Sequence, residues 1–306
     1  MNILVAGVAF TDIKGFPFAK YDPVGTNKGS VVITHGGVSR NVAEDLANLG
    51  ANVEFLTMLD DSPLGEDVKL RLEAAGVSLQ YAVSVPGGGI GMWLAVFDES
   101  GNLAGSISKM PDVLPLEKAL QDAGDMLVQS ADAVVVEYDT SEEIALLSCS
   151  LARKYNKPLY VIVGNMSVIL ARSDLMRACD CAIMNDIEAG KLFETSLDLP
   201  EKNDIAEQVL SCGRRLELKR AIITLGARGC VYADYTQNSV GWVDSVPCEV
   251  VDTTGAGDSF FSAAVISLSR GQSLRQACLN GARVAAGVVS SKQSACSRES
   301  RALLEM

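Results

Sequence analysis

The sequence lacks the residues on which several kinds of site depend. Its 306 residues include one histidine, His35, which excludes zinc sites built from two or three histidines. None of its eight cysteines forms a C-x-x-C pair, and their spacing suggests no disulfide framework. This usage is typical of a reduced protein, so we expect a cytoplasmic location.

Two common nucleotide-binding motifs are also missing. The only Gly-Lys pair, Gly190-Lys191, is followed by Leu192, so the chain has no P-loop. After the first apolar run, Gly7 is followed by Val8, and no G-x-G-x-x-G fingerprint appears there. A dehydrogenase on a dinucleotide-binding sheet is therefore disfavoured.

An excess of positive charge is absent as well. Lys and Arg number 26 against 38 Asp and Glu, for a net charge of −12. This balance argues against nucleic acid and anionic membranes as partners. A small phosphorylated ligand stays open, because backbone amides bind phosphate without help from net charge. The first apolar run, NILVAGVA, is too short to span a bilayer and has no basic stretch before it, so we expect no signal peptide.

Short apolar runs alternate with helical patterns along most of the chain. Strands are predicted at 3–9, 53–59, 132–138, 158–163, 181–184, 220–225 and 229–233. Helices are predicted at 38–49, 64–75, 141–156, 256–270 and 273–290. This alternation predicts an α/β fold with a mostly parallel central sheet and helices on both faces.

Two stretches, about 13–35 and 90–110, depart from that alternation. Each reads as strands without intervening helices, and the second contains a hairpin signal at 98–101. We interpret both as parts of a small β-sheet lid on one large domain that spans 1–306.

The segment 252–261, DTTGAGDSFF, is the strongest local signal for chemistry. Gly255, Ala256 and Gly257 form a tight turn after an extended run, and Asp258 then opens a helix. Amides at a helix start can bind an anion, and a carboxylate beside them can take a proton from an attacking hydroxyl. The alternative is a plain strand–turn–helix in which Asp258 lies near the N-cap.

A second signal is the segment 36–41, GGVSRN, before the first predicted helix. Gly36 and Gly37 allow a ligand to approach the backbone closely, and Asn41 follows one turn later. Asp12 is placed after the first strand, at the edge where open α/β sheets bind ligands. An ordinary turn into the helix, with Asp12 as a turn residue, is the alternative.

Together these segments resemble the ribokinase-like, or PfkB-type, family of carbohydrate and nucleoside kinases. The resemblance covers essentially the whole chain and implies the expected fold, with a β lid over the substrate. It implies an ATP-dependent kinase in which Asp258 is the catalytic base and Gly255, Ala256 and Gly257 form the anion hole. It also assigns Asp12, Gly36, Gly37 and Asn41 to the substrate hydroxyls.

The same resemblance implies an ATP site and metal ions. Asn185 and Glu188 match an N-x-x-E element that organises Mg²⁺ and phosphate through water. Thr224, Gly226 and Gly229 match a strand and turn that border ATP. Asp252 and Thr254 match the positions that bind a monovalent cation, K⁺, in some members.

One position departs from the family pattern. Many members carry an Asp after the strand that matches 158–163, whereas this chain has Gly164 followed by Asn165. Organisation of metal or phosphate there is expected to rest on Asn165, Asn185 and Glu188. A nucleoside-binding protein that has lost catalysis is the non-enzyme alternative, although the GAG turn and Asp258 are intact.

Finer features are similar to the pseudouridine kinase subfamily. They are Arg40 before Asn41 in GGVSRN, the preceding TNKGSVVITH, and GWVDSVP at 241–247. They predict phosphorylation of the 5′-hydroxyl of pseudouridine, with other nucleosides, ribose or other sugars as alternatives. Arg40 is a candidate substrate contact, or else the partner in a surface ion pair. The resemblance also implies a homodimer formed through the lid.

Overall fold

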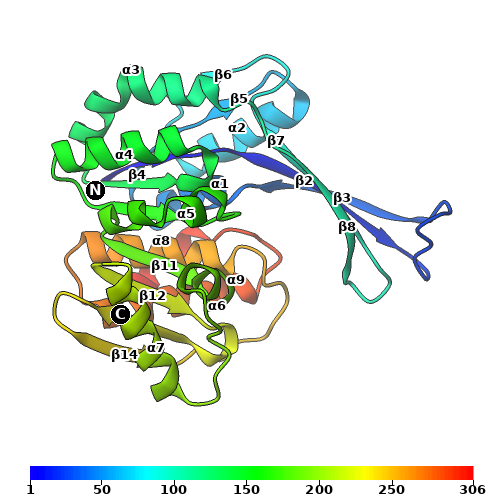
Figure 1. The fold of residues 1–306 in the computed structure, drawn as a ribbon. Helices are drawn as coiled ribbons and strands as arrows, with labels where there is room; N and C mark the ends of the chain where they lie inside the picture. The colour runs from blue at the N-terminus through cyan, green and yellow to red at the C-terminus, as the bar shows by residue number, and fades with distance from the viewer. Residues whose placement is uncertain (306) are drawn as a thin grey trace.

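A central eight-stranded sheet organises the computed structural model, which describes residues 1–305 (Figure 1). Its order is β14-β13-β12-β11-β10-β9-β1-β4. Six strands run parallel: β1 (Asn2–Ala6), β4 (Asn52–Leu56), β9 (Ala133–Glu137), β10 (Leu159–Ile162), β11 (Cys181–Asn185) and β12 (Arg220–Thr224). At one end of the sheet, β13 (Cys230–Asp234) pairs antiparallel with β12 and with the edge strand β14 (Ser239–Val243). The predicted α/β fold is confirmed.

Helices cover both faces of this sheet, because its strands are apolar on both sides. Along β1, Ile3 and Val5 belong to one buried cluster, and Leu4 and Ala6 belong to the other. One face is covered by α1 (Val38–Asn48), α2 (Pro63–Ala75), α8 (Ala256–Ser269) and α9 (Leu274–Val289). The opposite face is covered by α3 (Leu114–Ser130), α4 (Glu142–Lys154), α5 (Ser167–Ala171), α6 (Asp186–Phe193) and α7 (Lys202–Arg215).

The predicted elements differ from the observed ones in three places. The strand predicted at 3–9 ends at Ala6, because the chain turns away at Gly7, where an added Cβ would lie 2.0 Å from the Ser39 hydroxyl. The strand predicted at 53–59 is divided into β4 and the two-residue β5 (Met58–Leu59), which pairs with β6 (Val83–Ser84). The third difference is in elements that the sequence patterns did not predict, which include the helices α3, α5, α6 and α7 and the strand β14.

A separate four-stranded sheet, which we call the small sheet, projects from the body (Figure 1). Its strands, in the order β3-β2-β7-β8, are β3 (Gly29–Gly36), β2 (Phe10–Pro17), β7 (Gly91–Phe97) and β8 (Leu103–Lys109). The β7–β8 hairpin turns at residues 98–101, where Asp98 accepts hydrogen bonds from the backbone of Ser100 and Asn102.

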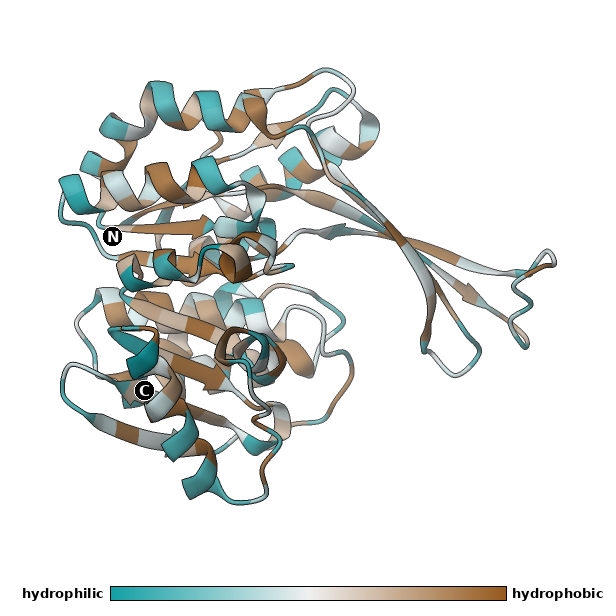
Figure 2. Cartoon of the chain, in the orientation of Figure 1, coloured by the Kyte–Doolittle hydropathy of each residue, from teal (hydrophilic) through white to brown (hydrophobic). Residues whose placement is uncertain are grey.

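Apolar residues, coloured brown in Figure 2, occur along the projecting strands. Val31, Ile33 and Ile107 are 70%, 55% and 68% exposed. Within residues 1–305, each helix is too short or too polar to cross a bilayer.

Helix α1 packs against β1 and β4 of the central sheet and against α2 and α8. Its buried face therefore offers a test of how the helices pack on this sheet. Leu46 is fully buried in α1, so Leu46→Ala should lower the free energy of unfolding by about 2–5 kcal/mol. Leu70→Ala in α2 removes the same atoms from a side chain that is 55% exposed and should cost about 0.5 kcal/mol or less. Urea unfolding of both variants measures the difference, and equal losses would contradict the packing described.

Candidate active site

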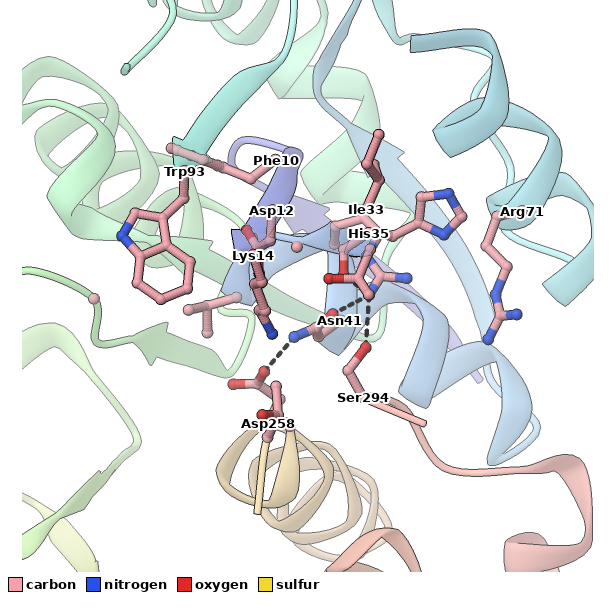
Figure 3. A pocket seen from close by; sticks show the side chains of 18 of the residues that line it. Phe10, Asp12, Lys14, Ile33, His35, Asn41, Arg71, Trp93, Asp258 and Ser294 are labelled. Atoms are coloured by element: carbon pink, nitrogen blue, oxygen red, sulfur yellow. Dashed lines mark hydrogen bonds between the residues drawn. The ribbon is translucent and has the colours of Figure 1, made fainter. Parts of the chain in front are cut away.

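A cleft of about 850 Å³ opens between the small sheet and the carboxyl ends of the central strands (Figure 3). It is lined from the small sheet, from the start of α1, from the start of α8 and from the segment after α9. Most of the residues singled out in the sequence meet here. They are Asp12, Gly36, Gly37, Arg40, Asn41, Asp252, Thr254, Gly255 and Asp258.

The two glycines at the end of β3 allow β2 and β3 to pack closely where α1 begins. A Cβ on Gly36 would lie 2.2 Å from Oδ1 of Asp12 on the neighbouring strand β2. Gly37 has φ +89°, and a Cβ there would lie 2.9 Å from the backbone nitrogen of Phe10. Both positions therefore need glycine for the protein's own packing. Burial raises the pKa of Asp12, against the lowering effect of the Lys14 and Arg40 charges.

Helix α8 begins at the cleft with a turn that only glycine suits. Gly255 has φ +78°, and a Cβ there would lie 1.9 Å from the Ser294 carbonyl oxygen. The amides of the first helical turn have no acceptor within the helix. That of Ala256 donates to the Thr253 carbonyl at 3.3 Å, and its neighbours are available to an anion. Asp258, in that turn, lines the cleft beside them.

The Asp258 carboxylate is held from α1. The Nδ2 group of Asn41 donates to Asp258 Oδ2 at 2.6 Å (Figure 3). Desolvation raises the pKa of Asp258 to about 6, against the lowering effects of this hydrogen bond and of the Arg40 charge. Such a carboxylate is ionised at neutral pH and basic enough to accept a proton from a hydroxyl in a transition state.

A second, smaller cavity of about 150 Å³ also borders Asp258. Asn185, Glu188, Thr224 and Gly257 line it, and Asp258 is common to both cavities. Asn185 and Glu188 form a capping box at the start of α6, in which each side chain accepts from the other's backbone amide, at 2.8 and 2.9 Å. Burial raises the pKa of Glu188.

The turn after β12 follows closely on Thr224, which lines the second cavity, but the residues of the turn itself do not line it. Gly226 and Gly229 flank a short 3₁₀ turn with φ values of +56° and +94°. A Cβ on Gly229 would lie 2.2 Å from the Val243 carbonyl, so this glycine allows the turn to pack on β14. The middle residues, Ala227 and Arg228, line another cavity of about 250 Å³.

Arg40 is buried rather than at the surface. Its guanidinium is 1% exposed and pairs with Glu44 one turn further along α1. It also donates to the Asn41 side-chain oxygen. The alternative of a surface ion pair is therefore wrong.

The sequence reasoning missed two carboxylates near Gly164. Glu137, at the end of β9, lines the cleft and accepts a 2.6 Å hydrogen bond from Ser39. Asp139 accepts from the Gly164 amide at 3.2 Å and from Val168 at 3.0 Å. Both follow a buried strand, and the rule that ligands bind at the carboxyl ends of parallel strands could have found them. Acidic groups thus border Gly164 from the end of the neighbouring strand and from the turn after it.

The oxygen donors suit a magnesium ion that is held mostly by phosphates and water. Within the described residues, no group of three or more His, Cys, Asp or Glu is arranged to hold a metal. The Asn185–Glu188 capping box engages only Oε2 of Glu188, which leaves Oε1 for a water ligand. Mg²⁺ commonly binds through one or two carboxylates, substrate phosphates and several waters.

Known proteins resemble this chain along nearly its whole length. A guanosine-inosine kinase from Exiguobacterium acetylicum is 34% identical over 295 residues, 95% of each chain. A pseudouridine kinase from Escherichia coli is 25% identical over 262 residues, 85% of this chain and 81% of that one. The structure of Arabidopsis thaliana ribokinase complexed with ribose and ATP superimposes with a TM-score of 0.85 at 22% identity, covering 99% and 98% of the two chains.

The model of the pfkB family carbohydrate kinases matches residues 2–301. This match spans both cavities and every segment that meets at Asp258. The chain is therefore a kinase of the pfkB carbohydrate kinase family.

Proposed function

We propose that this kinase transfers the γ-phosphoryl group of ATP to the 5′-hydroxyl of a nucleoside. The observation that carries the proposal is that two cavities meet at one partly desolvated carboxylate, Asp258. The larger cavity has room for a nucleoside, and the smaller adjoins the oxygen donors Asn185, Glu188 and Thr224. A hydroxyl acceptor in the larger cavity and a phosphoryl donor at the smaller one can thus both reach Asp258.

Each group at the start of α8 has a role in this reaction. Asp258 accepts the proton of the 5′-hydroxyl as its oxygen bonds to the γ-phosphorus, and the bond to the β-phosphate oxygen breaks to release ADP. The amides of Gly255, Ala256 and Gly257 stabilise the negative charge on the transferred group. Asp12, Asn41 and the Gly36-Gly37 backbone bind the ribose hydroxyls.

The nucleotide and Mg²⁺ are assigned to the smaller cavity, and K⁺ to the rim of the larger one. Asn185 and Glu188 would hold the waters of a bound Mg²⁺, whose charge would offset that of the ATP phosphates. Thr224, Gly226 and Gly229 border ATP. Asp252 and Thr254, where the carboxylate accepts from the Thr254 amide at 2.8 Å, lie at the rim of the cleft and bind K⁺.

Among nucleosides, guanosine and inosine are the first candidates. The support is 34% identity over 95% of both chains with a guanosine-inosine kinase. Phe10 and Trp93 supply aromatic surface in the cleft against which a base can pack. Pseudouridine is the second candidate, supported by the Arg40-Asn41 pair and by 25% identity with a pseudouridine kinase.

Removal of the proposed base tests the mechanism. Asp258→Asn should lower kcat about 10²–10⁴-fold with nucleoside affinity largely kept, because the amide cannot accept the proton. In the unmodified enzyme, kcat/KM should fall as pH drops below about 6, where Asp258 becomes protonated. Asp204→Asn, at an exposed position on α7, is the matched control and should leave both measurements unchanged. Near-normal kcat in Asp258→Asn would exclude it as the base.

A substrate panel tests the nucleoside assignment. The purified protein is given ATP and Mg²⁺ with guanosine, inosine, pseudouridine, uridine, adenosine, ribose or fructose 6-phosphate, and ADP release is measured. We expect the highest kcat/KM with guanosine or inosine. A preference for pseudouridine would support the second candidate instead. A preference for ribose or fructose 6-phosphate would refute both, and ligand-induced heat stabilisation without ADP release would indicate binding alone.

We also propose that the small sheet covers the substrate and pairs with a second copy of the chain. Val31, Ile33, Leu94 and Ile107 leave apolar surface exposed on it, which an interface between copies would cover. Light scattering should give a dimer mass for the unmodified chain. Val31→Glu combined with Ile107→Glu should give a monomer, whereas Leu70→Glu on α2 should stay dimeric. A monomeric unmodified chain would refute the dimer.

A further inference from the structure

The side-chain amide of Asn41 makes two hydrogen bonds of opposite polarity. Its oxygen accepts from Nη2 of Arg40, and its nitrogen donates to Oδ2 of Asp258 at 2.6 Å (Figure 3). A flipped amide would set the oxygen against the Asp258 carboxylate and the NH₂ group against the guanidinium. With both neighbours in place, only one orientation of the Asn41 amide can form both hydrogen bonds. In that orientation the NH₂ group donates to Asp258.

The Arg40 side chain is itself held in place. One of its terminal nitrogens, Nη1, pairs with Glu44, which is 2% exposed. Glu44 also accepts from Nε of Arg71 on α2 at 2.7 Å, so two arginines share one buried carboxylate. Because the guanidinium is planar and rigid, fixing Nη1 on Glu44 also fixes the direction in which Nη2 points.

Nη2 of Arg40 also lies close to two segments that border Asp258. Nη2 lies 3.3 Å from the His35 carbonyl and 3.3 Å from the Ser294 hydroxyl. Ser294 is the residue whose carbonyl packs against Gly255 at the start of α8. Within the described residues, no hydrogen bond joins Arg40 to Asp258 directly, so Asn41 is the link between them.

We infer that Arg40 is a positioning residue that acts through Asn41. It holds the Asn41 amide with its NH₂ group toward Asp258, so that Oδ2 of the carboxylate is occupied and Oδ1 is left for the substrate hydroxyl. The inference rests on the proposed role of Asp258 as the base. It gives Arg40 a role in the reaction other than direct contact with the substrate.

A direct charge effect is the competing explanation. The positive charge of Arg40 by itself lowers the pKa of Asp258, so its loss would raise that pKa even without Asn41. The two explanations differ in one respect: orientation of the amide requires Asn41, whereas the charge acts in its absence. A double-mutant cycle separates them.

The cycle compares the unmodified enzyme with Arg40→Met, Asn41→Ala and the double variant. The measurement is the midpoint of the acidic limb of kcat/KM against pH. Arg40→Met should raise this midpoint more in the presence of Asn41 than in the Asn41→Ala background, by about half a pH unit or more. Equal shifts in the two backgrounds would overturn the inference in favour of the charge alone.

Two further measurements keep the outcome interpretable. Thermal unfolding checks that each variant is folded, and Arg40→Gln, which is also uncharged, replaces Arg40→Met in the cycle if that variant does not fold. Asp258→Asn separates the inference from the proposed function: if it keeps near-normal kcat, the role of the base fails. If it is inactive while the Arg40 shifts are equal, only the positioning role fails.

The other charged groups around Asp258 and the cleft are not replaced in the cycle. They lie on α1, β9, α6 and β2, and they are Asp45, Glu137, Glu188, Asp12 and Lys14. Loss of the Arg40 charge also raises the pKa of Asp12, but it does so in both Asn41 backgrounds and so cancels in the comparison.

Discussion

The contact between α1 and α8 is the constraint on which the rest of the candidate site depends. Two side chains of α1, one turn apart, bond to consecutive residues of α8. Asn41 donates to Asp258, and Asp45 accepts from the Ser259 hydroxyl at 2.9 Å. Asp45 is fully buried and also accepts from the Cys296 amide at 2.6 Å. A shift of one helix along the other would break both bonds and move the carboxylate between the two cavities.

Burial of this contact raises the pKa values of its two carboxylates. Desolvation raises the pKa of Asp258 to about 6 and that of Asp45 to about 7. The two carboxylates differ in their access to ligands, because Asp258 borders both cavities whereas Asp45 is enclosed by protein. The same packing of helices therefore yields one carboxylate that can meet a substrate and one that serves as an internal link.

Many members of the family carry an Asp directly after the strand that corresponds to β10. In this chain the acidic groups of the cleft lie elsewhere. Gly164 carries no side chain at that position, but Glu137 at the end of β9 and Asp139 in the 3₁₀ turn after it approach Gly164. A Cβ on Gly164 would lie 3.4 Å from Oε1 of Glu137, which places this position in van der Waals contact with that carboxylate. The lack of an acidic residue at 164 is thus accompanied by acidic residues at the end of the adjacent strand and in the turn after it.

Local patterns in the sequence were enough to predict the α/β alternation and its parallel strands, because each of these elements buries its own periodic set of apolar residues, but they missed several helices between the strands. They also located the GGVSRN and DTTGAGD segments, whose glycines permit backbone geometry that other residues rarely adopt. Only the tertiary structure decided how these segments meet: Asn41 and Asp258 are 217 residues apart, and nothing in either segment specifies the other's position. The burial of Arg40 and the approach of Glu137 to Gly164 likewise arise when distant segments pack together, since desolvation and hydrogen-bond partners are properties of the assembled core.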